Sequence, residues 1–316
     1  DALVIGELEA PVAGPGEVLI RLDASGVNPS DVKKRAGSFP ALLDDGLVIP
    51  DSDGAGIIED VGEGVDASRV GERVWVYQAQ FARRFGTAAE YVALESSRAV
   101  PLPDNVDFEV GACLGIPAMT AHRCVFADGD VNGLTIVITG AAGRVGYYAV
   151  QWASQAGATV IATASNEEDA AACKAVGAAH VVNHRSDSFA DDILAANAGG
   201  RVDRTIDLEF GANLATWVAV VKASGTIATY GSVAVPEPTL PFFQLMYLDM
   251  NIRFIIVYAM PEAAKQQAIA DISTALTNDV LQHRIAAKFP LEDIAAANKL
   301  IENGTIRGAV ILNIDD

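Results

Sequence analysis

The chain of 316 residues is long enough for two domains, each with its own core, and 51% hydrophobic residues are typical of a globular protein. A formal net charge of −19 argues against a nucleic-acid partner, because binding to phosphates requires a basic face, and it disfavours anionic membranes. No apolar run reaches the roughly 18 residues that a membrane-spanning helix needs. Three cysteines without a C-x-x-C pair indicate reduced thiols and a cytoplasmic protein.

The first hundred residues predict a β-rich domain. Short apolar runs at residues 17–22, 56–61 and 73–77 are separated by Gly, Pro and Asp. Turn signals recur about every ten to fifteen residues, a spacing that favours barrel-like closure of the sheet.

From about residue 130 onward, the pattern changes to alternating strands and helices. We expect strands at 135–139, 159–164, 181–183, 202–208, 226–230 and 252–258, with helices at 167–176 and 213–222 among the segments between them. Such alternation predicts a parallel sheet with crossover helices on both faces. Residues 261–316 predict two amphipathic helices and a closing strand at 309–312.

A glycine-rich turn follows the β-branched run Thr135–Thr139. The segment Gly140–Gly146 fits G-x-G-x-x-G with Ala141 in the first glycine position, and an apolar-striped helix follows it. Gly143 would let the backbone approach a pyrophosphate, Gly146 would allow close helix–sheet contact, and the helix N-terminus would attract the phosphates. This context predicts a dinucleotide site; the alternative is a tight turn without a ligand.

The end of the second strand of this sheet indicates which dinucleotide binds. NAD-binding proteins carry Asp or Glu there to bind the ribose diol, whereas this chain has the neutral Ser165 and Asn166. The sequence therefore favours NADPH over NADH. The acidic residues at 167–169 count against this preference, and His184 and Arg185 would offset their charge.

The order of the domains resembles that of the medium-chain dehydrogenase/reductase superfamily. Five segments are similar to its zinc-free quinone oxidoreductase branch, which includes zeta-crystallin: Ala24–Asp31, Pro50–Gly56, Gly115–Ala121, the glycine loop and Val182–Arg185. The resemblance covers essentially the whole chain. It implies an α/β protein with a GroES-like β-rich catalytic domain at 1–103 and 262–316, and a Rossmann doubly wound parallel-sheet domain at 104–261. It also implies that the opening strand of the family is missing before Asp1.

The resemblance implies a cofactor site in the second domain. The matching residues are Ala142, Gly143, Arg144, Val145, Gly146, Ser165, His184, Asn213, Tyr230, Gly231, Ser232, Ile255, Ile256 and Val257, with Thr120 near the nicotinamide carboxamide. Arg144 stands where the family usually has a small glycine. Asp169 stands where some bacterial relatives carry a phosphate-binding lysine, which weakens the preference for NADPH.

The same resemblance predicts that the protein holds no zinc. Zinc alcohol dehydrogenases have a cysteine, a histidine and a cysteine at places that match Ser25, Ser52 and the neighbourhood of Ile116. Serine hydroxyls and an isoleucine are not the thiolate or imidazole ligands that zinc prefers. The four-cysteine structural lobe of those enzymes is missing as well.

We therefore expect an NADPH-dependent enzyme that transfers hydride to a small-molecule electrophile, a quinone or an α,β-unsaturated carbonyl. Asn28 is the candidate donor to the acceptor oxygen; alternatively, it satisfies a local Asn-Pro turn. Two other functions stay open: a 2-enoyl-thioester reductase, which would need a basic patch, and a non-catalytic, NADPH-binding, crystallin-like protein. The apolar strand candidate at 251–258 predicts a homodimer.

Overall fold

The computed structural model describes residues 3–44 and 46–314, and the chain divides into two compact units. Unit 1 extends to Pro117 and resumes at Ile269, and unit 2 lies between them. These boundaries come later than the predicted 103/104 and 261/262. The first boundary comes later because the short helix α2 (Phe108–Gly111) packs against strands of unit 1. The second boundary falls within the helix α9 (Glu262–Thr277).

Unit 1 is built around one long strand, β1. β1 pairs with β2 along its length, with β4 through its first half and with β13 through its second half. The sheet order is β12-β13-β1-β2-β3-β5, and β4 branches from it by pairing with β1. The strands are β1 (Glu17–Val27), β2 (Asp53–Val61), β3 (Arg73–Val76), β4 (Tyr91–Glu95), β5 (Ala99–Pro101), β12 (Ile285–Pro290) and β13 (Ala309–Asn313).

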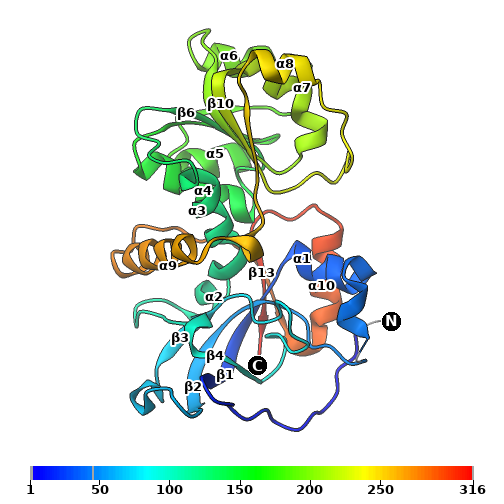
Figure 1. The fold of residues 1–316 in the computed structure, drawn as a ribbon, viewed down its shortest axis with the longest axis vertical. Helices are drawn as coiled ribbons and strands as arrows, with labels where there is room; N and C mark the ends of the chain where they lie inside the picture. Colours follow the sequence, from blue (N-terminus) through cyan, green and yellow to red (C-terminus); the bar gives the residue numbers. More distant parts are fainter. Residues whose placement is uncertain (1–2, 45, 315–316) are drawn as a thin grey trace. The chain divides into compact units, whose positions relative to one another are not determined.

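The C-terminal segment completes the core of unit 1. In Figure 1 the red strand β13 lies beside the blue β1, and the helix α10 (Ile294–Glu302) lies beside α1 (Pro29–Lys33). Alternate residues of β1, Val18, Ile20 and Leu22, are fully buried in a core that α10 helps to cover. The period-2 pattern of β1 therefore follows from having a single apolar face.

Unit 2 contains a parallel sheet in the order β11-β10-β9-β6-β7-β8, with helices between its strands, as in a Rossmann domain. Its strands are β6 (Thr135–Ile138), β7 (Thr159–Thr163), β8 (His180–Val182), β9 (Val202–Asp207), β10 (Val221–Thr229) and β11 (Asn251–Phe254). Its helices are α3 (Met119–Phe126), α4 (Arg144–Gln155), α5 (Glu167–Ala175), α6 (Phe189–Ala196), α7 (Phe210–Val220), α8 (Phe242–Tyr247) and the first part of α9.

The continuous apolar runs of these strands reflect burial on both faces. In β6, Ile136, Val137 and Ile138 are all fully buried, and Val137 packs in one cluster with Trp217 of α7. A strand with two covered faces has no polar alternation. Within the described residues no helix is long and apolar enough to cross a membrane.

Several elements differ from the sequence-based expectation: β4 and β5 were not among the expected strands, and β10 begins at Val221 rather than at residue 226. β11 ends at Phe254 instead of residue 258, because its partner β10 ends opposite it at Thr229 and leaves no strand to pair with. β12 was not expected, since its Ala-rich sequence with one lysine does not indicate a strand; it forms by parallel pairing with β13. The sheet order puts β11 at the edge of its sheet, where a second copy could pair, so the homodimer stays a prediction.

We predict that Leu22→Ala lowers the free energy of unfolding by about 3 kcal/mol, because it removes a fully buried side chain from the core of unit 1. Urea unfolding followed by circular dichroism measures the change. Val70→Ala is the control, since Val70 is 49% exposed and its truncation should cost less than about 0.5 kcal/mol. Equal losses for the two variants would contradict the burial assigned to Leu22.

Candidate active site

The glycine loop brings the first turn of α4 directly behind the end of β6. The Gly143 N–H donates to the Gly140 carbonyl at 2.8 Å, and Gly143 is the N-cap of α4. A Cβ atom on Gly146 would lie 2.2 Å from that same carbonyl oxygen, so only glycine fits there. Since the first amides of a helix have no intrahelical acceptor, the predicted residues 142–146 form a turn suited to an anion.

The carboxylate of Asp207 joins the ends of β6 and β9, the two strands between which the sheet order reverses. Its Oδ1 accepts from the Thr139 hydroxyl at 2.7 Å and from the Asn213 amide at 2.9 Å. Its Oδ2 accepts from the Trp217 indole N–H at 2.7 Å. Asn213, a predicted cofactor contact, is thus held in place at the start of α7. The sequence analysis missed Asp207, although a carboxylate at a strand end was visible as a signal.

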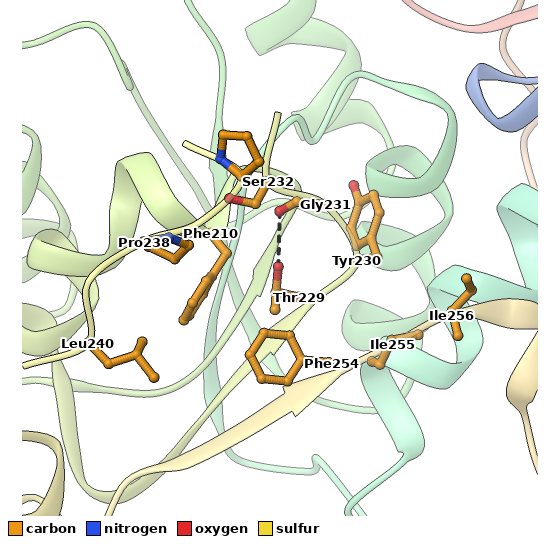
Figure 2. Close-up of a pocket in the computed structure, with 11 residues that line it drawn as sticks. Phe210, Thr229, Tyr230, Gly231, Ser232, Pro238, Leu240, Phe254, Ile255 and Ile256 are labelled. Carbon is orange, nitrogen blue, oxygen red and sulfur yellow. Dashed lines mark hydrogen bonds between the residues drawn. The ribbon is translucent and has the colours of Figure 1, made fainter. Parts of the chain in front are cut away.

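A pocket of about 480 Å³ opens beyond the ends of β10 and β11 (Figure 2). Five of the predicted cofactor residues line it: Tyr230, Gly231, Ser232, Ile255 and Ile256. The other lining residues are Phe210, Thr229, Pro236, Pro238, Leu240 and Phe254. The sixth predicted residue of this group, Val257, is buried but does not line the pocket.

The walls of this pocket are largely apolar, with a few polar groups at fixed positions. The rings of Phe210 and Phe254 meet edge to face, with centroids 5.5 Å apart. Burial raises the pKa of Tyr230 well above its usual range, and nearby Cys124 and Asp207 add to the shift, so its phenol stays protonated. Ser232 Oγ accepts from the Gly211 N–H at 2.9 Å and donates to the Val235 carbonyl, which fixes the wall formed by the segment after β10.

The residues predicted at the adenosine end lie in the loops after β7 and β8. Ser165 is half-buried, and His184 is exposed. Asn166 caps α5: its side-chain oxygen accepts from the Asp169 N–H at 2.8 Å, and its amide donates to the Asp169 carboxylate at 2.8 Å. The carboxylate of Asp169 is therefore engaged within the first turn of α5. Thr120 lies buried in α3 and is not among the residues that line the pocket.

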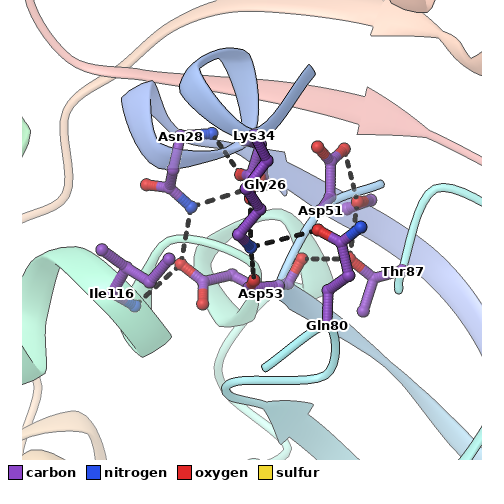
Figure 3. A network of polar contacts seen from close by, with 11 residues as sticks. Gly26, Asn28, Lys34, Asp51, Asp53, Gln80, Thr87 and Ile116 are labelled. Carbon is purple, nitrogen blue, oxygen red and sulfur yellow. Dashed lines mark hydrogen bonds and ion pairs between the residues drawn. The ribbon is translucent and has the colours of Figure 1, made fainter. Parts of the chain in front are cut away.

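Unit 1 holds a second group of polar side chains, which we call the buried polar cluster (Figure 3). Its members are at most 8% exposed: Ser25, Asn28, Asp31, Lys34, Asp51, Ser52, Asp53, Gln80 and Thr87. The Lys34 ammonium lies 3.2 Å from Asp31 Oδ1, 2.9 Å from Ser52 Oγ and 3.0 Å from Gln80 Oε1. The sequence analysis did not use the three aspartates or this lysine, because residue types alone do not reveal that charges are buried.

Asn28, the predicted donor to the acceptor oxygen, is engaged inside this cluster. Its amide donates to Asp53 Oδ2 at 2.8 Å and to the Gly26 carbonyl at 3.3 Å. The two N–H groups are thus used within unit 1, and Asn28 can donate to a ligand only by giving up one of these bonds. The structure locates Asn28 in the same network as Ser25 and Ser52.

The cluster does not resemble a zinc site. The Ser25 hydroxyl contacts Asp51 and Thr87, and the Ser52 hydroxyl accepts from the Lys34 ammonium. A cation of the protein thus lies against one of the two serines that match zinc-ligand positions. Across residues 3–44 and 46–314, no group of three or more His, Cys, Asp or Glu side chains is arranged to hold a metal ion.

Asp53 is a fully buried acid with unequal oxygens. Its Oδ2 accepts from Asn28 and from the Ile116 N–H, each at 2.8 Å, whereas its Oδ1 is buried without a hydrogen-bond partner. A Cβ atom on Gly115 would lie 2.1 Å from that Oδ1, so the carboxyl group requires a glycine beside it. Burial, with a smaller effect of the Asp31 charge, raises the pKa of Asp53 to about 8. Asp53 is therefore mostly neutral at pH 7.

Known protein families match both domains of this chain. Residues 14–104 match the family described as alcohol dehydrogenase GroES-like domain, and residues 145–274 match that described as zinc-binding dehydrogenase. The quinone oxidoreductase of Rattus norvegicus is 30% identical over 97% of this chain and 92% of its own length. A 2-haloacrylate reductase of a Burkholderia species is 28% identical over 99% of this chain and 95% of its own length. A mycobacterial protein complexed with NADPH superposes with a TM-score of 0.86 at 26% identity, covering 98% of this chain and 95% of that one.

This chain belongs to the quinone oxidoreductase branch of the medium-chain dehydrogenase/reductase superfamily. It is therefore an oxidoreductase with a GroES-like domain and a Rossmann domain, as the resemblance in the sequence indicated. The name of the second matching family refers to zinc binding, whereas the buried polar cluster of this member offers hydroxyls, carboxyls and an ammonium group.

We predict that the stability of the protein falls as pH rises between about 4 and 8, in part through Asp53. Its folded pKa of about 8 lies above the unfolded value of 3.8, so the stabilisation from the neutral acid is complete below pH 3.8 and is lost as pH rises. One such group contributes a slope of about −1.4 kcal/mol per pH unit between the two values.

Asp53→Asn should make this slope less steep by about 1.4 kcal/mol per pH unit, because asparagine does not titrate. The variant should still fold, since the asparagine side-chain oxygen still accepts from Asn28 and Ile116. Urea unfolding between about pH 5 and 7 measures the slope. Asp104→Asn is the control, because Asp104 is exposed. An unchanged slope in Asp53→Asn would show that Asp53 is ionised in the folded protein.

Proposed function

We propose that this chain is an NADPH-dependent reductase that transfers hydride to a quinone or an α,β-unsaturated carbonyl compound. The observation that carries the proposal is the arrangement in unit 2: the glycine loop caps α4, and the predicted residues after β10 and β11 line one pocket. The glycine loop and the N-terminus of α4 suit a phosphate group, and the apolar pocket suits a planar ring. The name of the Burkholderia relative supports an activated alkene as acceptor.

The chain's own residues would bind the cofactor and orient it. The first-turn amides of α4 would hold the pyrophosphate, and the apolar walls around Phe210 and Phe254 would keep water from the ring. When bound, NADPH supplies the hydride. The protonated phenol of Tyr230 is a polar group that this pocket offers for positioning, while the Ser232 hydroxyl holds the pocket wall through Gly211 and Val235.

We further propose that the reaction does not require zinc. A carbonyl–alcohol exchange needs an electrophile to polarise oxygen, whereas a conjugated acceptor spreads the developing charge over its own system. The hydroxyls of Ser25 and Ser52 are hydrogen-bonded within the buried polar cluster, with the Lys34 ammonium 2.9 Å from Ser52. These contacts support a reaction in which the protein orients the cofactor and the acceptor and no metal ion polarises the acceptor oxygen.

The preference for NADPH is supported by the loop after β7. The Asp169 carboxylate is tied to Asn166 in the first turn of α5, so it does not stand at the strand end as the ribose-binding acid of an NAD site does. The solved structure with NADPH, at a TM-score of 0.86, is a relative of the same fold.

A steady-state assay tests the reaction. NADPH oxidation should occur with a quinone and with an α,β-unsaturated ketone, and should persist in the presence of a metal chelator. Faster turnover of an enoyl thioester would support the alternative thioester reductase, for which an acidic chain of net charge −19 is poorly suited. Cofactor binding by calorimetry without turnover of any acceptor would overturn the proposed activity in favour of a non-catalytic binding protein.

Cofactor preference is tested at Ser165. Ser165→Asp should raise the dissociation constant of NADPH about tenfold or more, since a carboxylate at the strand end repels a 2′-phosphate, and should leave NADH binding equal or tighter. Ser165→Ala is the matched control that removes the hydroxyl without adding charge. Calorimetric titration with each cofactor measures the two dissociation constants. If their ratio is the same in Ser165→Asp as in the natural chain, Ser165 does not lie beside the 2′-phosphate.

A further inference from the structure

A line of four oxygen atoms runs through the buried polar cluster from Asp51 to the backbone of Asp53 (Figure 3). Asp51 Oδ2 lies 3.2 Å from Ser25 Oγ, Ser25 Oγ lies 2.8 Å from Thr87 Oγ1, and Thr87 Oγ1 lies 2.7 Å from the Asp53 carbonyl oxygen. The side chains of Asp51, Ser25 and Thr87 are fully buried. Each of the three contacts therefore needs a hydrogen atom from the protein itself.

The direction of each bond follows from the last one. A carbonyl oxygen can only accept, so Thr87 donates its one hydroxyl hydrogen to Asp53. Thr87 must then accept from Ser25, which uses the one hydrogen of the Ser25 hydroxyl. No hydroxyl hydrogen remains for the contact between Ser25 and Asp51. That contact is a hydrogen bond only if Asp51 carries a proton on Oδ2.

Two further observations agree with a protonated Asp51, and one charge opposes it. Its Oδ1 is buried without a hydrogen-bond partner, which is tolerable for the carbonyl of a neutral acid and costly for a carboxylate. Burial, followed by the charge of Asp31, raises its pKa well above the usual range. The opposing charge is Lys34, whose ammonium contacts Asp31, Ser52 and Gln80.

The backbone at Asp51 also indicates a role beyond packing. Its φ of 72° lies in the left-handed region, which costs free energy in a residue other than glycine. The chain thus keeps a strained backbone and a buried acid at one position. Neither feature stabilises the fold, so a requirement for this side chain is the simplest account.

We propose that Asp51 is a neutral carboxylic acid that acts as a positioning residue, by donating the third hydrogen of this line and so holding Asp53 where it binds the Asn28 amide. Asp53 connects the two parts, because its carbonyl accepts from Thr87 and its carboxyl accepts from Asn28. When Asp51 ionises, two hydrogens remain for the three contacts, so one of the three hydrogen bonds is lost. The link to catalysis rests on the proposed reductase function and on the sequence-based prediction that Asn28 donates to the acceptor oxygen, whereas the protonation of Asp51 rests on neither.

Infrared difference spectra test the protonation without any assay of activity. At neutral pH the natural chain should show the carbonyl band of a buried, protonated carboxylic acid, and Asp51→Asn should lack the Asp51 component. Asp53→Asn identifies the component of the other neutral acid, and Asp104→Asn, at an exposed position, should leave the bands unchanged. A spectrum in which Asp51→Asn removes only an ionised carboxylate band overturns the proposal.

The sign of a pKa change gives a second test of the bond direction. Ser25→Ala removes the acceptor of the Asp51 proton, so the neutral acid loses stabilisation and the pKa of Asp51 should fall. If Ser25 instead donated to an ionised Asp51, the same substitution would raise that pKa. Infrared titration of Ser25→Ala against the natural chain measures the sign, and a rise contradicts the proposal.

The pH profile of the reductase tests the positioning role. Asp51→Ala should lower kcat about tenfold or more, as expected when a neighbour of a catalytic group is misplaced. Asp51→Asn, whose amide donates at every pH and whose residue type tolerates positive φ, should recover most of this loss and lack the alkaline transition of Asp51. An Asp51→Asn profile that keeps the transition would contradict the role, while absence of turnover in every variant would refute the proposed function alone.

Discussion

The rest of unit 2 depends on the carboxylate of Asp207. β6 and β9 lie side by side, and the connections that follow them leave toward different parts of the sheet, so a crevice opens beyond their ends. Asp207 crosses that point, binding Thr139 after β6 and the side chains of Asn213 and Trp217 on α7. A fully buried carboxylate is stable there because Thr139, Asn213, Trp217 and the Glu209 N–H all donate to it. The glycine loop follows Thr139, and Phe210 of the pocket lies on α7, so both features adjoin residues that this carboxylate binds.

Most of the fold could be predicted from the sequence, because burial leaves a pattern in each unit. The strands of unit 2 are covered on two faces and read as continuous β-branched runs, so the expected range 135–139 matches β6 to within one residue. Two of the differences show what ends or forms a strand. β11 is shorter than its apolar run because pairing, not hydrophobicity, ends a strand, and β12 is held by its neighbour β13 rather than by its own residue types.

From the residues themselves, the sequence gives the clearest signal where a backbone conformation demands a residue, whereas the predicted residues that line the pocket came from the resemblance. Gly146 could be assigned because a side chain there would collide with the Gly140 carbonyl, and such a glycine is visible as a spacing. The buried polar cluster gave no comparable signal. Asp31, Lys34, Asp51 and Asp53 have the residue types of a solvated surface, and their burial follows from how β1, β2 and the segment after Pro50 assemble. Asn28 stands out in the sequence as part of a motif, yet its side-chain amide donates to Asp53, 25 residues away, a contact that the motif does not reveal.

Within the buried polar cluster, four ionisable side chains lie close together with little net charge. Asp31 and Lys34 form a pair, so their charges cancel. Asp53, with a pKa of about 8, is largely uncharged at pH 7, and a neutral Asp51 would leave the cluster without net charge. The unfolded chain would ionise these two acids, so keeping them neutral costs stability that a pair of apolar residues would not cost. Asp51, retained under that penalty on a backbone with positive φ, is there for the hydrogen atom that it donates, whereas Asp53 is there as the acceptor of the Asn28 and Ile116 N–H groups.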